Sequence, residues 1–162
     1  STIARIPETA PATLPDAPEP WRIDGTISCI AGRGILDDAV TAMLEQLLEK
    51  RQFGVRRIRN AEVGRDAVAR LDLSDSRLIC LSYLEIGGNP THLRLLSRRL
   101  RRAAPNARIL VGLWPEGEKA LTDREIQLLI GADDYVATFG QAVEQCLRIA
   151  HNHDEEAIRT SA

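Results

Sequence analysis

Short runs of β-branched and other apolar residues alternate with longer stretches of helical period, and this alternation constrains the fold more than any other feature. Strands that alternate with helices form a parallel sheet that those helices cover on both faces. The pattern predicts five strands, at residues 26–31, 54–58, 78–81, 108–113 and 134–137. It predicts five helices, at residues 37–51, 62–71, 90–104, 123–130 and 140–150.

Right-handed crossovers between these elements predict a three-layer, doubly wound α/β sandwich, with a five-stranded and mainly parallel sheet in the flavodoxin-like order 2-1-3-4-5. The length of 162 residues fits one domain. We expect a proline-rich linker at 1–24, because five of the eight prolines fall within the first 20 residues. The α/β domain then spans 25–150, and a frayed polar tail spans 151–162.

Composition limits the classes of function. Hydrophobic residues make up 44% of the chain and charged residues 27%, as in ordinary globular proteins. The net charge of −2 and only two each of Trp, Tyr and Phe argue against nucleic acid as a partner. The cysteines, Cys29, Cys80 and Cys146, match no metal-ligand spacing. We expect buried, reduced thiols, which favour a reducing compartment, and no metal site.

In doubly wound sheets, ligands bind at the carboxyl ends of the strands, where the strand order reverses. The loops after the first, third and fourth strands are rich in glycine, which permits close approach to a ligand. Tight turning alone also explains the first of these loops. The side chains of Tyr83, Glu85, Trp114 and Glu116 are consistent with a small-molecule or partner pocket, or with a loop-packing cluster. The candidate ligand-binding residues are Gly32, Arg33, Gly34, Ser82, Tyr83, Glu85, Gly112, Trp114 and Glu116.

The third predicted helix carries a stripe of arginines opposite its leucines. Such a stripe suits an anionic lipid surface or a protein partner. A solvated face that pairs with scattered acids is the alternative. The residues of this basic stripe are Arg94, Arg98, Arg99, Arg101 and Arg102.

Known catalytic constellations are incomplete in this sequence. Asp37 and Asp38 suggest a phosphoacceptor site, but such a site needs an aspartate at the end of the third strand and a lysine after the fifth, and the chain has neither. We expect Asp37 to be an N-cap or first-turn acid. Ser82, His92 and Glu85 supply the residue types of a hydrolase triad, but no G-x-S-x-G elbow surrounds the serine. We therefore expect that the chain is not an enzyme.

Residues 36–55 resemble the first helix and second strand of cobalamin-binding domains. Their D-x-H-x-x-G motif aligns with Ile35, Asp37 and Val40, their serine motif with residues 82–84, and their glycine pair with the segment around Gly112. Asp37 stands where that family has its axial histidine, and a carboxylate is a poor substitute for imidazole on cobalt. Trp114 would crowd the nucleotide slot. The resemblance therefore implies the family's skeleton with its ligand chemistry lost and no cofactor retained.

Residues 29–39, 80–85, 92–102 and 110–115 resemble the cytoplasmic C-terminal extension of some bacterial permeases of the autoinducer-2 exporter-like family, over residues 21–147 in all. The resemblance implies a non-enzymatic regulatory or interaction domain of a membrane permease, at the cytoplasmic face of the bacterial inner membrane. Its partner would be the membrane-embedded part of the same polypeptide, with an anionic lipid surface or a second copy as further partners. The alternative is a soluble domain that senses a nucleotide or corrinoid in the strand-end crevice.

Overall fold

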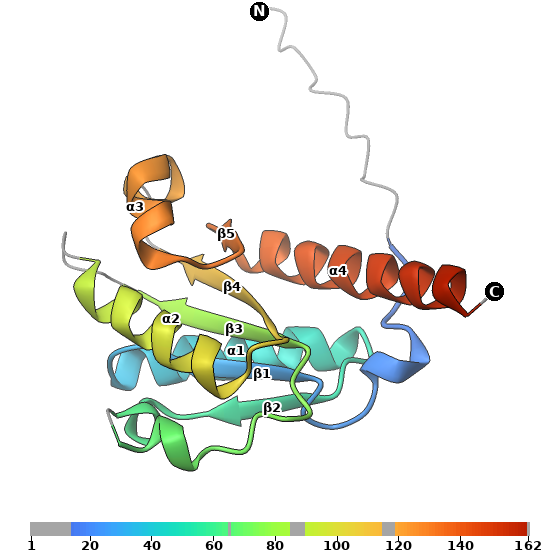
Figure 1. The fold of residues 1–162 in the computed structure, drawn as a ribbon, viewed down its shortest axis with the longest axis horizontal. Coiled ribbons are helices and arrows are strands. Elements are labelled where there is room, and N and C mark those ends of the chain that lie inside the picture. The colour runs from blue at the N-terminus through green and yellow to red at the C-terminus, as the bar shows by residue number, and fades with distance from the viewer. Residues whose placement is uncertain (1–13, 65, 85–89, 115–118, 162) are drawn as a thin grey trace, which may run out of the picture.

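A five-stranded, fully parallel sheet forms the centre of the protein, in the predicted order β2-β1-β3-β4-β5. The structure is a computed structural model, and it describes residues 14–64, 66–84, 90–114 and 119–161. The predicted flavodoxin-like α/β topology is confirmed (Figure 1). The strands are β1 (Ile27–Ala31), β2 (Val55–Ile58), β3 (Leu78–Tyr83), β4 (Arg108–Leu113) and β5 (Asp134–Val136).

Helices cover both faces of the sheet. One face packs against α1 (Ile35–Lys50) and α4 (Phe139–Thr160), and the other packs against α2 (Thr91–Ala103). The short helix α3 (Arg124–Ile130) contacts α2 at the β4–β5 side of the sheet. Asp123 caps α3, because its side chain accepts hydrogen bonds from two backbone amides of the first turn. None of the helices within these described ranges is long and apolar enough to cross a bilayer.

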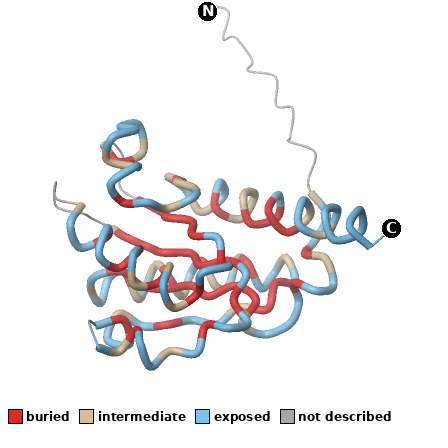
Figure 2. The backbone as a smooth tube through the Cα atoms, viewed as in Figure 1, coloured by how far each residue is buried: buried red, intermediate tan, exposed pale blue. Residues whose placement is uncertain are grey.

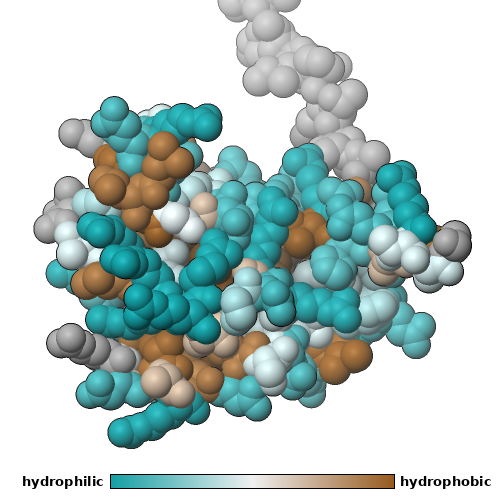
Figure 3. Space-filling model, in the orientation of Figure 1, coloured by the Kyte–Doolittle hydropathy of each residue, from teal (hydrophilic) through white to brown (hydrophobic). Residues whose placement is uncertain are grey.

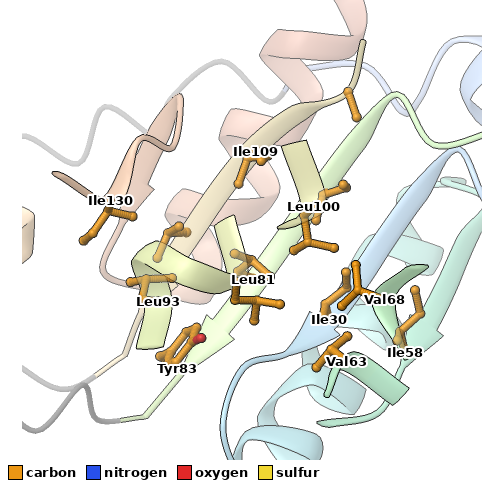
Figure 4. Close-up of a cluster of buried hydrophobic side chains, with 14 of the residues drawn as sticks. Ile30, Ile58, Val63, Val68, Leu81, Tyr83, Leu93, Leu100, Ile109 and Ile130 are labelled. Atoms are coloured by element: carbon orange, nitrogen blue, oxygen red, sulfur yellow. The ribbon is translucent and has the colours of Figure 1, made fainter. Parts of the chain in front are cut away.

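Alternation along the strands divides the core into two layers. Ile79, Leu81 and Tyr83 of β3 face α2, whereas Leu78 and Cys80 face α1 and α4. Figure 4 shows the layer beneath α2, and Figure 2 shows that the central strands are buried. A parallel sheet covered on both faces reads as continuous apolar sequence, which is why these strands could be recognised.

The predicted helix at residues 62–71 is wrong. Two 3-10 turns occupy this region, η2 (Asn60–Val63) and η3 (Val68–Arg70). The buried anchors Val63 and Val68 are five residues apart, so they cannot lie on one face of an α-helix. Gly64 adopts an extended conformation between them. Two short turns bury both valines where one helix could bury only one.

Both ends of the domain extend further than expected. Ala17 and Trp21 are buried in the core, so the described part of the predicted linker packs onto the domain. The Trp21 ring meets His153 of α4 edge-on, at a centroid distance of 6.0 Å. The helix α4 continues through Thr160, and the segment expected to be a frayed tail is therefore helical. No Gly or Pro interrupts the sequence after Ala150, so nothing stops the helix there.

Candidate functional site

The carboxyl edge of the sheet brings together most of the predicted ligand-binding residues. The backbone amide of Gly32 donates to the carbonyl oxygen of Ser82 over 3.0 Å, and that of Trp114 donates to the carbonyl oxygen of Tyr83 over 3.2 Å. Gly112 pairs with Ser82 in the sheet register. The predicted residues Arg33 and Gly34 lie between β1 and α1. Two further predicted residues, Glu85 and Glu116, lie outside the described residues.

Asp37 connects two of these loops. It lies in the first turn of α1 and is 5% exposed. One carboxylate oxygen accepts the backbone amides of Arg33 at 2.8 Å and Gly34 at 3.3 Å, and the other accepts the amide of Leu84 at 2.8 Å. A buried carboxylate with three backbone donors is well satisfied. The N-cap itself is Gly34, so Asp37 fits the expected first-turn acid, with an additional bond to the end of β3.

A second polar link, which the sequence analysis missed, joins the end of β2 to the same edge. The carboxylate of Asp38 accepts the backbone amide of Asn60 at 2.9 Å, and the Asn60 side chain donates to the carbonyl oxygen of Gly32 at 3.2 Å. These partners are 22 and 28 residues apart in the chain. Only the consecutive acids at the start of α1 hinted at such a contact.

Tyr83 closes the edge on the α2 side. A Cβ atom added to Gly32 would lie 2.2 Å from the Tyr83 ring, so the ring occupies the space that the glycine leaves. The Tyr83 hydroxyl is 3.0 Å from His92 Nδ1. Burial, together with the charge of Asp37, raises the pKa of Tyr83 above its ordinary value. Burial and the nearby Arg33 and Arg99 lower the pKa of His92, and both shifts favour the neutral forms of the two rings.

Trp114 closes the edge on the opposite side of the sheet. A Cβ atom at Gly112 would lie 2.2 Å from the Trp114 ring, which also packs on Phe139 at a centroid distance of 4.7 Å. Neither Trp114 Nε1 nor Ser82 Oγ has a hydrogen-bond partner within the described part of the chain. Because Ser82 and Gly112 are paired in the register, the unpartnered hydroxyl belongs to the strand pair that Trp114 covers.

The arginines of the basic stripe lie elsewhere, on α2. Four of them line one depression of about 560 Å³ between α2 and α3: Arg94, Arg98, Arg101 and Arg102. The remaining member, Arg99, is half-buried, does not line the depression, and lies near His92. The strand-end residues and the four arginines of the depression are therefore two separate surfaces, and Arg99 lies on the His92 side.

Comparison with known proteins supplies a fold relationship. No family model and no curated protein matches the chain. Among solved structures, the fold is similar to that of a novel cobalamin-binding protein from Desulfitobacterium hafniense DCB-2, with a TM-score of 0.55 and 17% sequence identity. The match covers 75% of this chain and 57% of that one, so the chain spans a little over half of its length. The likeness supports the flavodoxin-like fold and nothing finer.

The residues at the strand ends do not fit a corrinoid. The resemblance in sequence aligns Asp37 with the axial histidine of cobalamin-binding domains, and in the structure both of its oxygens already accept backbone amides. An oxygen donor of this kind is also poorly suited to cobalt. The Trp114 ring fills the space beside Gly112. The fold is similar, but the chain's own carboxylate contacts and aromatic rings occupy this edge.

The contacts of Asp37 generate a stability prediction. An asparagine at this position has one oxygen, and its NH₂ group faces backbone donors. We expect Asp37→Asn to lower the free energy of unfolding by about 2 kcal/mol, and Asp38→Asn, which keeps the single acceptor it needs, by less than about 1 kcal/mol. Urea unfolding measures both variants. Equal losses would show that Asp37 acts only through its charge.

The unpartnered hydroxyl of Ser82 generates a second prediction. Removing a buried hydroxyl without a partner should leave stability unchanged or raise it by about 1 kcal/mol, so we expect this of Ser82→Ala. The control is Ser28→Ala on β1, because Ser28 Oγ bonds Ser76 Oγ at 2.6 Å. This control should lose about 1 kcal/mol in the same thermal melts. A comparable loss in Ser82→Ala would reveal a water or ligand bound to its hydroxyl.

Proposed function

We propose that the chain is a non-enzymatic regulatory or interaction domain that binds no cofactor at its strand ends. The single observation that carries this proposal is the filling of the edge by the rings of Tyr83 and Trp114, at the two glycines that permit close approach. The polar groups beside them support it. The Asp37 carboxylate is committed to backbone amides, and the Tyr83 hydroxyl is in contact with His92. These groups hold loops together rather than meet a substrate.

The resemblance to permease C-terminal extensions supports a finer form of this proposal. In that form, the domain belongs to a membrane permease, lies at the cytoplasmic face of the inner membrane and regulates the membrane-embedded part of the same polypeptide. Such a role needs a stable scaffold with an exposed contact surface and no active site. The filled strand-end edge and the separate arginine-lined face are consistent with it.

A second candidate function is the sensing of a small molecule, such as a nucleotide or corrinoid. Two observations favour it: the fold is similar to that of a cobalamin-binding protein, and Ser82 Oγ and Trp114 Nε1 are buried without partners. In this alternative, the Trp114 ring would move aside and a ligand would satisfy both groups. The two candidate functions differ in what happens when ligand is added.

Ligand addition separates them directly. The purified chain is mixed with excess hydroxocobalamin or ATP, and is followed by gel filtration and by thermal melting. We expect no corrinoid absorbance in the protein peak and no rise in melting temperature, because the edge is already filled. A bound ligand at 100 times its dissociation constant would add about 2.7 kcal/mol of stability. Such a rise, abolished in the Ser82→Ala variant, would establish the sensor instead.

Cell fractionation tests the permease form. An antibody against this domain is used on fractionated native cells. The permease form predicts a band in the membrane pellet at a mass well above the 17.9 kDa of this chain. A band near 17.9 kDa in the soluble fraction would remove the permease form, while leaving the broader proposal of an interaction domain in place.

A further inference from the structure

The outer face of α2 carries a concentration of positive charge, in which the described carboxylates pair only with Arg101. Residues 91–103 contain five arginines and no carboxylate. Arg94, Arg98 and Arg102 are exposed and spaced four residues apart, so they are neighbours along one face of the helix. Among the described residues, none of these three forms an ion pair. Like charges at this spacing repel one another, and an anionic partner would relieve that repulsion.

Arg101 has a different task, because it fixes the neighbouring helix in place. Its guanidinium donates to the carbonyl oxygens of Ala107 at 3.3 Å and Gly131 at 3.0 Å, and it pairs with Asp133 at 3.1 Å. Asp133 also accepts the backbone amide of Ile109 at 2.8 Å. These bonds join α2 to the end of α3 and to β4. The two helices that flank the depression are therefore bonded to each other at one end.

The other wall of the depression is apolar. Leu128 and Leu129 of α3 are 71% and 56% exposed, and both line the depression opposite the arginines. Figure 3 shows the apolar surface over α3 beside the hydrophilic surface over α2. Adjacent exposed leucines beside a row of cations give the depression one apolar wall and one basic wall. An occupant has to present anionic groups to one wall and apolar groups to the other.

We propose that the α2–α3 depression docks an acidic amphipathic helix of a partner protein, with its carboxylates on Arg94, Arg98 and Arg102 and its apolar side chains on Leu128 and Leu129. Arginine forms paired hydrogen bonds with carboxylates, and an amphipathic helix offers two chemically different faces to such a groove. A level membrane surface fits less well, because here the leucines and arginines lie on opposite walls of a recess of about 560 Å³. The proposal rests on the proposed interaction role and adds the place and the chemistry of the partner.

A designed peptide tests the proposal on the intact chain. The probe is a fluorescent peptide of about 18 residues, with Glu on one helical face and Leu on the other, long enough to form helix on binding. A scrambled peptide of the same composition, and one with Gln in place of Glu, are the matched controls. Binding is followed by fluorescence anisotropy at low and physiological salt. We expect the Glu/Leu peptide to bind at least about tenfold more tightly than either control, because both charge and pattern are required.

Substitutions test whether the peptide binds in the α2–α3 depression. Arg98→Glu and Arg102→Glu are expected to weaken binding by at least about tenfold, and Leu128→Ser by a similar factor. The matched control is Arg99→Glu, which makes the same charge change on the same helix outside the depression, and it should stay within about twofold to threefold. Thermal melts confirm that each variant folds, and Arg98→Gln repeats the test without a new negative charge.

Three results would overturn the proposal. The first is that the Glu/Leu peptide does not bind. The second is that Arg99→Glu weakens peptide binding as much as Arg98→Glu does. The third is that the scrambled peptide binds as tightly as the Glu/Leu peptide. Vesicles of phosphatidylglycerol are tested in parallel, and binding to vesicles without binding to the peptide would assign the surface to a membrane instead. No residue of the depression belongs to the strand-end edge. Corrinoid binding would therefore overturn the proposed function without changing the peptide result.

Discussion

The strand-end architecture depends on the hydrogen bonds that the Asp37 carboxylate accepts from three backbone amides. A doubly wound sheet leaves backbone amides exposed where its loops turn, and those amides normally attract a ligand. Here one side chain from the first turn of α1 accepts amides from its own loop and from the end of β3. The two loops are thereby fixed to each other, and the rings of Tyr83 and Trp114 pack over the glycines beside them. This edge lies where such folds bind ligands, but the protein's own side chains stabilise it.

The sequence predicted the strands because each is a short apolar run buried on both sides, and their order followed from the crossover rule. It failed where burial depended on partners distant in the chain. Val63 and Val68 fall within a segment of helical composition but are anchored separately by two turns. Trp21 lies among prolines, and only contacts with Phe53 and His153 show that it belongs to the core.

The candidate site was predictable in its location and less so in its contacts. The carboxyl ends of β1, β3 and β4 do lie together, and the position of Asp37 at the start of α1 was expected. That its carboxylate reaches Leu84, 47 residues away, could not be read from local pattern. The cysteines show the same limit. All three are buried and free as expected, yet Cys80 and Cys146, 66 residues apart, bring their sulfur atoms within 3.8 Å.

The packing of the N-terminal segment on α4 has a structural consequence. His151 Nε2, just past the middle of α4, lies 2.9 Å from the carbonyl oxygen of Pro15. The Arg51 guanidinium at the end of α1 bonds the carbonyl oxygen of Leu14 and the carboxylate of Asp16, so the segment is anchored to both helices. With 22 residues, α4 is a rod of about 33 Å, and its N-terminal end carries Phe139 against Trp114. The helix that holds the incoming segment is therefore the same helix whose first residue supports the ring over the strand-end edge.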